Sequence, residues 1–121
     1  LHLAQADLAD NFHLREMKAQ VELKELVDAF REVMKRSQAF EHHHIHKEVL
    51  STRERMAAVL ALLRNADEQE AYLEFSRLFV VEEGRQGVIV TFLAILELIK
   101  GSLIECIQSE VCGQIQVRLT S

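Results

Sequence analysis

The sequence has 121 residues, enough for one or two small domains with a modest hydrophobic core. Its net charge of −5 speaks against a surface built to bind nucleic acid, and its two cysteines are too few for a disulfide scaffold. The chain contains no proline and is rich in Leu, Glu, Ala and Lys, so the composition predicts a mainly α-helical fold.

The chain begins at Leu1 rather than at Met, and no basic region followed by a short apolar run marks a signal peptide. The longest apolar run, from 88 to 99, is shorter than the roughly 20 residues that a membrane-spanning helix needs. We therefore expect a cytoplasmic piece of a longer protein, with no membrane contact and with reduced cysteines.

Residues 1–17 show no sustained hydrophobic period, and we expect a connecting arm there. From 18 to 37, apolar residues recur at three- and four-residue steps, which predicts an amphipathic helix with one buried stripe. The stripe consists of Leu23, Leu26, Val27, Phe30, Val33 and Met34. It packs either against the rest of this chain or, as the alternative, against a partner subunit.

Residues 38–50 are expected to be extended or loop. They carry His42, His43, His44 and His46, and imidazole is the commonest transition-metal ligand. A structural zinc site, however, needs four ligands from well-separated positions, and no cysteine or further histidine pair completes one. We therefore expect no physiological metal and no other cofactor.

Ser51 and Glu54 have the spacing of a capping box, which predicts that a helix begins there. Residues 64–65 close this helix, whose core stripe consists of Met56, Val59, Leu60 and Leu63. After a polar break at 66–70, a second short helix is expected, and its apolar residues are Tyr72, Phe75, Leu78 and Phe79.

Residues 84–100 form the most apolar stretch, and only Thr91 and Glu97 interrupt the run from 88 to 99. The composition predicts a helix, with Gly101 at the C′ position. A helical wheel assigns a core face to Ile89, Phe92, Leu93, Leu96 and Ile99. The other side carries an uncharged ridge of Val90, Ala94 and Leu98. This ridge is either covered by the chain itself or exposed as a docking face for a partner protein.

Two stretches after Gly101 alternate with the period of a β-strand, at 103–108 and 115–120. A turn at 111–113 would join them into a hairpin. If the loop covers 109–113, Cys106 faces Gln116 and Gln108 faces Gln114. Cys106 and Cys112 are therefore not expected to form a disulfide.

Three helices followed by a two-stranded β wing is the order of elements in a winged helix. We expect this domain over 49–121, preceded by the arm at 1–17 and by an amphipathic helix with an extended linker at 18–48. In DNA-reading winged helices the third helix presents Arg, Lys, Asn or Gln to the major groove. The uncharged ridge predicted here is instead typical of a protein-binding face.

Other functions have weaker support in the residues. An enzyme is disfavoured because no Ser-His-Asp or Cys-His pairing has a supporting motif and glycine is scarce. Glu97 is a single carboxylate in an apolar helix, and such a residue more often pairs with a neighbour than acts in catalysis. A winged-helix DNA-binding transcriptional regulator would need a basic recognition face. Self-association of the chain as a homodimer through the ridge is a further alternative.

Several stretches resemble the C-terminal part of the bacterial segregation and condensation protein A family over about residues 21–121. They are LSTRERM at 50–56, FSRLF at 75–79, GVIVTFLAILELIK at 87–100, and Gln108 with CGQIQV at 112–117. One departure is Cys112, where the family usually has an aromatic residue before the glycine.

The resemblance implies a non-enzymatic kleisin subunit of a bacterial SMC–condensin complex, which acts in chromosome condensation and segregation at the nucleoid. Its winged helix would dock on the SMC ATPase head, and segregation and condensation protein B would hold the segment that ends in the arm at 1–17. No sequence-specific nucleic-acid binding is implied. Carried onto this chain, the expected head-binding residues are Val90, Ala94, Leu98, Ile115 and Val117.

Overall fold

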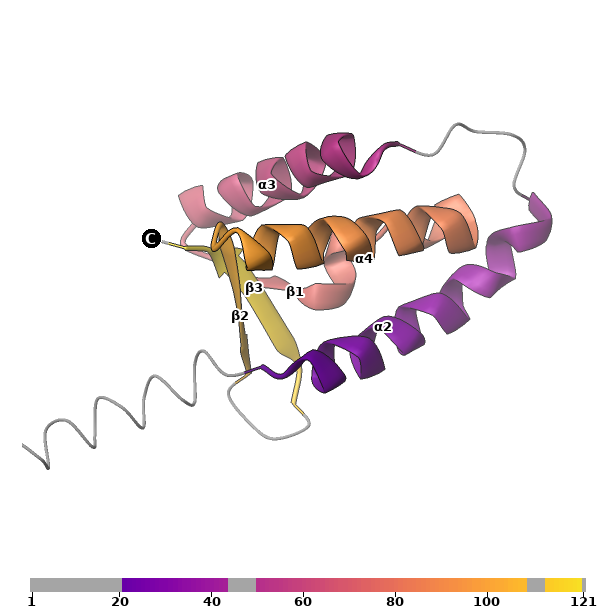
Figure 1. The fold of residues 1–121 in the computed structure, drawn as a ribbon, viewed down its shortest axis with the longest axis horizontal. Helices are drawn as coiled ribbons and strands as arrows, with labels where there is room; N and C mark the ends of the chain where they lie inside the picture. The colour runs from indigo at the N-terminus through magenta and orange to yellow at the C-terminus, as the bar shows by residue number, and fades with distance from the viewer. Residues whose placement is uncertain (1–20, 44–49, 109–112, 121) are drawn as a thin grey trace, which may run out of the picture.

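The computed structural model describes residues 21–43, 50–108 and 113–120. In chain order its elements are α2 (Leu23–Ser37), the 3-10 helix η1 (Gln38–His43), α3 (Thr52–Glu68), β1 (Leu73–Glu74), the 3-10 helices η2 (Phe75–Leu78) and η3 (Val81–Glu83), α4 (Gly84–Lys100), β2 (Ile104–Gln108) and β3 (Ile115–Leu119). Figure 1 shows α4 between α3 and α2, with the sheet at the end where α4 stops. The predicted class, mainly helical with a winged-helix-like C-terminal part, is confirmed.

Helix α2 is the predicted amphipathic helix. Its stripe packs against the core of the chain itself, because Leu26 and Val33 are buried and three further members are partly buried there: Val27, Phe30 and Met34. Leu23, at the start of the helix, is the exception and is 60% exposed. The Phe30 ring stacks on the Phe92 ring of α4, with ring centroids 4.2 Å apart and planes 7° from parallel. This contact joins α2 to the central helix.

The segment predicted to be extended or loop, 38–50, begins instead with η1. The Gln38 amide donates to carbonyls at the end of α2, so the backbone keeps turning as a tighter helix. Glu41 then accepts a hydrogen bond of 2.9 Å from the Arg85 amide, which places a carboxylate at the N-terminus of α4. Residues 44–49 and the side chains of His42 and His43 lie outside the described part of the chain, so the metal prediction stays a prediction.

Helix α3 begins with the predicted capping box. The Ser51 hydroxyl accepts from the Glu54 amide at 3.2 Å, and the Glu54 carboxylate accepts from the Ser51 amide at 3.1 Å. These hydrogen bonds, the backbone one foremost, lower the pKa of the Glu54 carboxyl. The helix is longer than predicted, because Ala66 is buried and the helix continues past it to Glu68. Glu70, with φ 54°, then ends it in the left-handed conformation.

The predicted second short helix is a 3-10 helix and is shorter than expected, because a strand precedes it. The chain forms the two-residue strand β1 and then η2, which the Glu74 carboxylate caps by accepting from the amide and hydroxyl of Ser76. Pairing of Leu73 with Val117 of β3 holds this segment extended. The apolar residues of the segment reach the core without an α-helix, and Phe75, Leu78 and Phe79 are buried.

Strands β1, β3 and β2 form an antiparallel sheet in that order, with β3 in the centre. The predicted hairpin register is wrong by one residue, because Cys106 faces Val117 and Gln108 faces Ile115. The observed register places the buried Cys106 and Val117 side by side, whereas the predicted one would have paired the cysteine with a glutamine. It also sets Glu105 opposite Arg118 in a cross-strand ion pair.

Candidate partner-docking surface on the central helix

The predicted ridge of α4 faces the core instead of solvent. Ala94 and Leu98 are both 0% exposed, and Val90 is half-buried. Of the two alternatives left open by the sequence, cover by the chain itself is therefore the one observed, and an exposed docking face on this side of the helix is wrong. Buried Gly87 and Ala94 keep this side of α4 narrow, so α3 can approach closely.

Thr91 is a polar residue on this buried side of α4, and its burial leaves the hydroxyl satisfied by a hydrogen bond. The Thr91 hydroxyl donates to the Gly87 carbonyl at 2.9 Å, so the fully buried threonine has its hydrogen-bond partner within the helix. Small side chains and a satisfied hydroxyl thus suit the core. The opposite side of α4 carries larger apolar residues, and for this reason the helical wheel assigned it the core face.

The two predicted wing residues are also in the core. Ile115 is 5% exposed and Val117 is 0% exposed. Both lie on β3, the central strand of the sheet, and α3 packs against this strand. Of the five predicted partner-binding residues, only Val90 therefore has surface that a partner could contact, and only in part.

The exposed side of α4 carries Ile89 and Leu93, which are 36% and 47% exposed. They are one helical turn apart and therefore share a face. The same face continues to polar residues toward the helix ends, which are Gln86, Glu97 and Lys100. We call this set, Gln86, Ile89, Leu93, Glu97 and Lys100, the α4 stripe.

Sequence reasoning assigned Ile89 and Leu93 to the core face and so missed the α4 stripe. A signal was present: on a helical wheel, Gln86, Glu97 and Lys100 fall on the same side as Leu93. Three polar residues sharing a side mark that side as the one facing solvent. The centre of the stripe is apolar and uncharged, and its charges lie near the C-terminal end.

The N-terminal end of α4 is held by a partly buried ion pair. Arg55 of α3 donates from Nη2 to Oε2 of Glu83 at 2.8 Å, and the Arg55 side chain is only 7% exposed. Gly87 makes room for the Glu83 side chain, because a Cβ at Gly87 would lie 2.4 Å from Glu83 Cβ and 2.8 Å from Glu83 Oε1. The pair joins α3 to the start of α4 and so sets the position of the α4 stripe.

The sheet contains two further chemical groups of interest. Burial, and secondarily the charge of Glu105, raises the pKa of the free Cys106 thiol from its ordinary 9.0 to about 12, so the thiol is unreactive at neutral pH. Arg118 bonds the Glu105 carboxylate and donates to the Tyr72 hydroxyl at 3.0 Å. The bond to Glu105 raises the pKa of the Arg118 guanidinium. The Cys106 thiol and the contacts of Arg118 therefore contribute to the packing of the sheet, and we assign them no chemical role.

Among the described residues, no group of three or more His, Cys, Asp or Glu side chains is placed to hold a metal ion. Within the same part of the chain, no helix has both the length and the hydrophobicity needed to cross a membrane.

Comparison with known proteins identifies the family. Residues 4–120 match the family model described as Segregation and condensation protein ScpA. Segregation and condensation protein A of Coxiella burnetii (strain RSA 493 / Nine Mile phase I) is 45% identical over 97 residues, which cover 80% of this chain and 35% of that protein. The protein of the same name from Xylella fastidiosa (strain 9a5c) is 42% identical over 115 residues, covering 95% of this chain and 36% of that protein.

A more distant relative of the same name, from Myxococcus xanthus (strain DK1622), is 37% identical over 92 residues and covers 74% of this chain and 30% of that protein. The chain thus spans about a third of the length of the curated relatives that it matches. Since the family model extends over nearly all of the sequence, the chain belongs to the segregation and condensation protein A family.

Proposed function

We propose that this chain is the C-terminal part of a non-enzymatic kleisin subunit of a bacterial SMC–condensin complex. In this proposal it acts in the cytoplasm at the nucleoid, and its winged-helix-like part docks on the ATPase head of an SMC subunit. Segregation and condensation protein B binds a preceding segment of the same subunit. Family membership and the winged-helix-like order of elements support this function.

The observation that carries the docking proposal is the exposed apolar pair on α4. Ile89 and Leu93 occupy the centre of the helix that would read DNA in a winged-helix regulator, and both are open to solvent. Apolar side chains on a helix face fit a groove or flat patch on another protein. Val90 contributes its exposed part at the edge, while Ala94, Leu98, Ile115 and Val117 are buried and offer no surface to a partner.

The alternative function, a DNA-binding transcriptional regulator, is not favoured. Its recognition helix would need cationic or amide side chains at the centre of the exposed face to reach base edges and phosphates. In the α4 stripe that centre is Ile89 and Leu93. The net charge of −5 opposes phosphate binding as well.

Binding of the chain to an isolated SMC ATPase head, measured by calorimetric titration, tests the proposal. Leu93→Arg should weaken binding by at least about tenfold, because a charge would be buried in an apolar contact without a partner. Val80→Arg is the matched control, since Val80 is 44% exposed and lies between η2 and η3, outside the α4 stripe. Both substitutions replace an exposed side chain, so both variants should keep the helical circular dichroism of the parent.

Loss of binding by Leu93→Arg alone supports the proposal. The proposal is contradicted if the parent chain does not bind the head. It is also contradicted if Leu93→Arg and Val80→Arg bind the head with equal affinity. A salt-dependent shift of duplex DNA by the parent would favour the regulator instead.

A further inference from the structure

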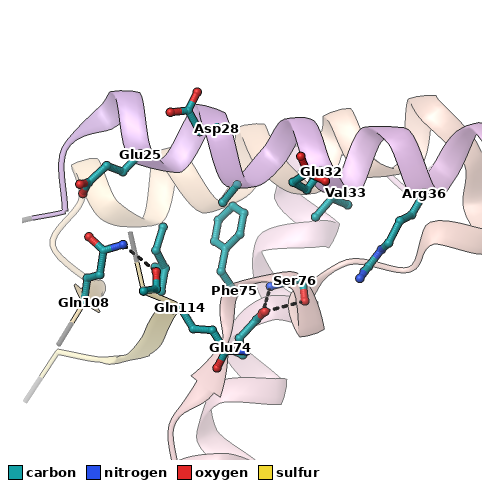
Figure 2. Close-up of a pocket in the computed structure, with 13 residues that line it drawn as sticks. Glu25, Asp28, Glu32, Val33, Arg36, Glu74, Phe75, Ser76, Gln108 and Gln114 are labelled. Atoms are coloured by element: carbon teal, nitrogen blue, oxygen red, sulfur yellow. Dashed lines mark hydrogen bonds between the residues drawn. The ribbon is translucent and has the colours of Figure 1, made fainter. Parts of the chain in front are cut away.

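A groove of about 460 Å³ runs between α2 on one side and η2 with the β2–β3 end of the sheet on the other. Its volume lies within the range of pockets that hold small molecules or peptide side chains. Figure 2 shows α2 along one wall, with Glu25 at one end and Arg36 at the other. The residues that line it are different from those of the α4 stripe.

The floor of the groove is apolar. Val33, Phe75 and Ile115 line it and are between 1% and 5% exposed, and half-buried Ala29 lies on α2 between its acidic residues. These groups belong to the packed core, so the floor is preformed. An apolar ligand side chain of moderate size can pack against this floor and so be removed from water, which is favourable.

The rim carries four carboxylates and one guanidinium. Glu25, Asp28 and Glu32 follow one another along α2 at three- and four-residue steps, and Glu74 lies on the other wall. Figure 2 shows the Asp28 carboxylate on the outer side of α2, turned away from the floor. Hydrogen bonds from the amide and hydroxyl of Ser76 hold the Glu74 carboxylate in place. Among the described residues that line the groove, Arg36 is the cation, and it lies at one end.

Two further cations of α2 lie beside the rim, because Arg31 pairs with Asp28 at 3.9 Å and Lys35 pairs with Glu32 at 3.4 Å. Both pairs are exposed and therefore weak, and the four carboxylates outnumber the cations, so the rim keeps a net negative charge over an apolar floor.

We propose that this groove binds a basic segment of a partner protein, in which Lys or Arg residues flank one or two apolar side chains. The acidic rim attracts the Lys or Arg side chains, and the apolar side chains of the segment pack against the floor. From Glu25 to Arg36 the wall is about 16 Å long at the rise of an α-helix, which matches about five residues of extended chain. The inference stands independently of the proposed docking on the SMC head.

Other occupants fit the groove less well. Nucleic acid and anionic lipid would place phosphates against the carboxylates of the rim. A second copy of this chain carries the same net charge of −5 and would be repelled at the same rim. Charge complementarity therefore favours a basic peptide.

The test uses the fluorescein-labelled peptide KRLFKR, with EELFEE as its charge-reversed control, and reads binding by fluorescence anisotropy. The double variant Asp28→Asn/Glu32→Gln removes two exposed carboxylates from the rim. It should weaken KRLFKR binding by about threefold to tenfold, the effect of losing two rim ion pairs. The matched variant Asp67→Asn/Glu68→Gln changes the net charge equally at the exposed end of α3 and should bind as the parent does.

Amide NMR spectra of the same titration locate the peptide. Selective shifts at Ala29, Phe75 and Ile115, together with weakening by the rim variant alone, support the proposal. It is overturned if the parent does not bind KRLFKR, if both double variants weaken binding equally, or if the shifts map to the α4 stripe. A concentration-dependent dimer that the rim variant abolishes would assign the groove to a second copy and would also overturn it.

Discussion

Gly84 begins α4 with φ 80° and ψ −170°, a region of backbone space that is used almost only by glycine. It is buried at the junction of η3 and α4, next to the ion pair of Glu83. A side chain here would meet backbone strain. The conformation of this one residue thus sets the direction in which α4 begins.

Gly84→Ala should lower the free energy of unfolding by about 1–3 kcal/mol, the usual cost of such backbone strain. Gly101→Ala is the control, because Gly101 has φ −81° and its added Cβ would make an ordinary contact of 3.5 Å with the Glu97 carbonyl. That variant should remain within about 0.5 kcal/mol of the parent. Urea denaturation of both variants measures the difference, and equal stability would show that Gly84 is not strained.

Local signals in the sequence predicted some residues well and others poorly. The capping box at Ser51 and Glu54 was correct, because it depends only on residues three apart. The C′ position of α4 was assigned to Gly101, but the left-handed residue is Ser102, with φ 60°. The amides of Ser102 and Leu103 donate to the last helical carbonyls, so these bonds end the helix where glycine usually does.

At the scale of elements, the Arg55–Glu83 pair links α3 to the last residue of η3, which is also the N-cap of α4. Arg55 Nε and Glu83 Oε1 are buried and have no hydrogen-bond partner within the described residues, so the pair depends on its single bond of 2.8 Å. Removing one partner would leave the other charge buried without compensation.

Glu83→Gln should therefore lower the free energy of unfolding by about 2–3 kcal/mol at neutral pH, below the full cost for a buried pair because the Glu83 side chain is 29% exposed. The matched substitution Glu105→Gln breaks the more exposed pair with Arg118 and should cost only about 0.2–1 kcal/mol. Thermal or urea denaturation distinguishes the two. If Glu83→Gln is the milder change, the ion pair does not hold α3 and α4 together.

Cys106, in the sheet, supplies a pH-dependent test. Its thiol stays neutral in the folded chain up to a pKa of about 12, whereas in the unfolded chain it ionises near the ordinary value of 9.0. Between these values the unfolded state binds fewer protons, so the free energy of unfolding falls as the pH rises above about 9.

In a Cys112→Ser background, the parent should lose stability more steeply above about pH 9 than Cys106→Ala does. Its native thiol should also react with an aromatic disulfide reagent at pH 8 far more slowly than the urea-unfolded chain. Parallel stability curves for the two proteins, or equal reaction rates in the two states, would contradict burial of this thiol.

Periodicity predicted the long elements, and tertiary contacts decided the rest. The bounds 84–100 of α4 were correct because apolar composition and the flanking glycines mark them. The two-residue strand β1 and the sheet register were missed because both depend on pairing with β3. The exposed side of α4 was assigned wrongly because a helix with apolar residues on both sides does not reveal which side α3 covers.

At the scale of the whole molecule, α2 and the winged-helix-like part share one hydrophobic core. Leu26 and Val33 of α2 belong to the same cluster as Ile95 of α4 and Val117 of β3. The sequence left open whether the α2 stripe packs on its own chain or on a partner, because both give the same period. With α2 packed inward, the α4 stripe and the groove are left as two surfaces with no residue in common.

A methyl NMR titration tests the central claim most directly. The chain, with labelled Ile and Leu methyl groups, is titrated with an isolated SMC ATPase head. The account predicts the largest changes at Ile89 and Leu93, the exposed residues of the α4 stripe, and small changes at Leu98, which is 0% exposed. Changes confined to the sheet or to the groove, with the signals of Ile89 and Leu93 unaltered, would contradict docking through α4.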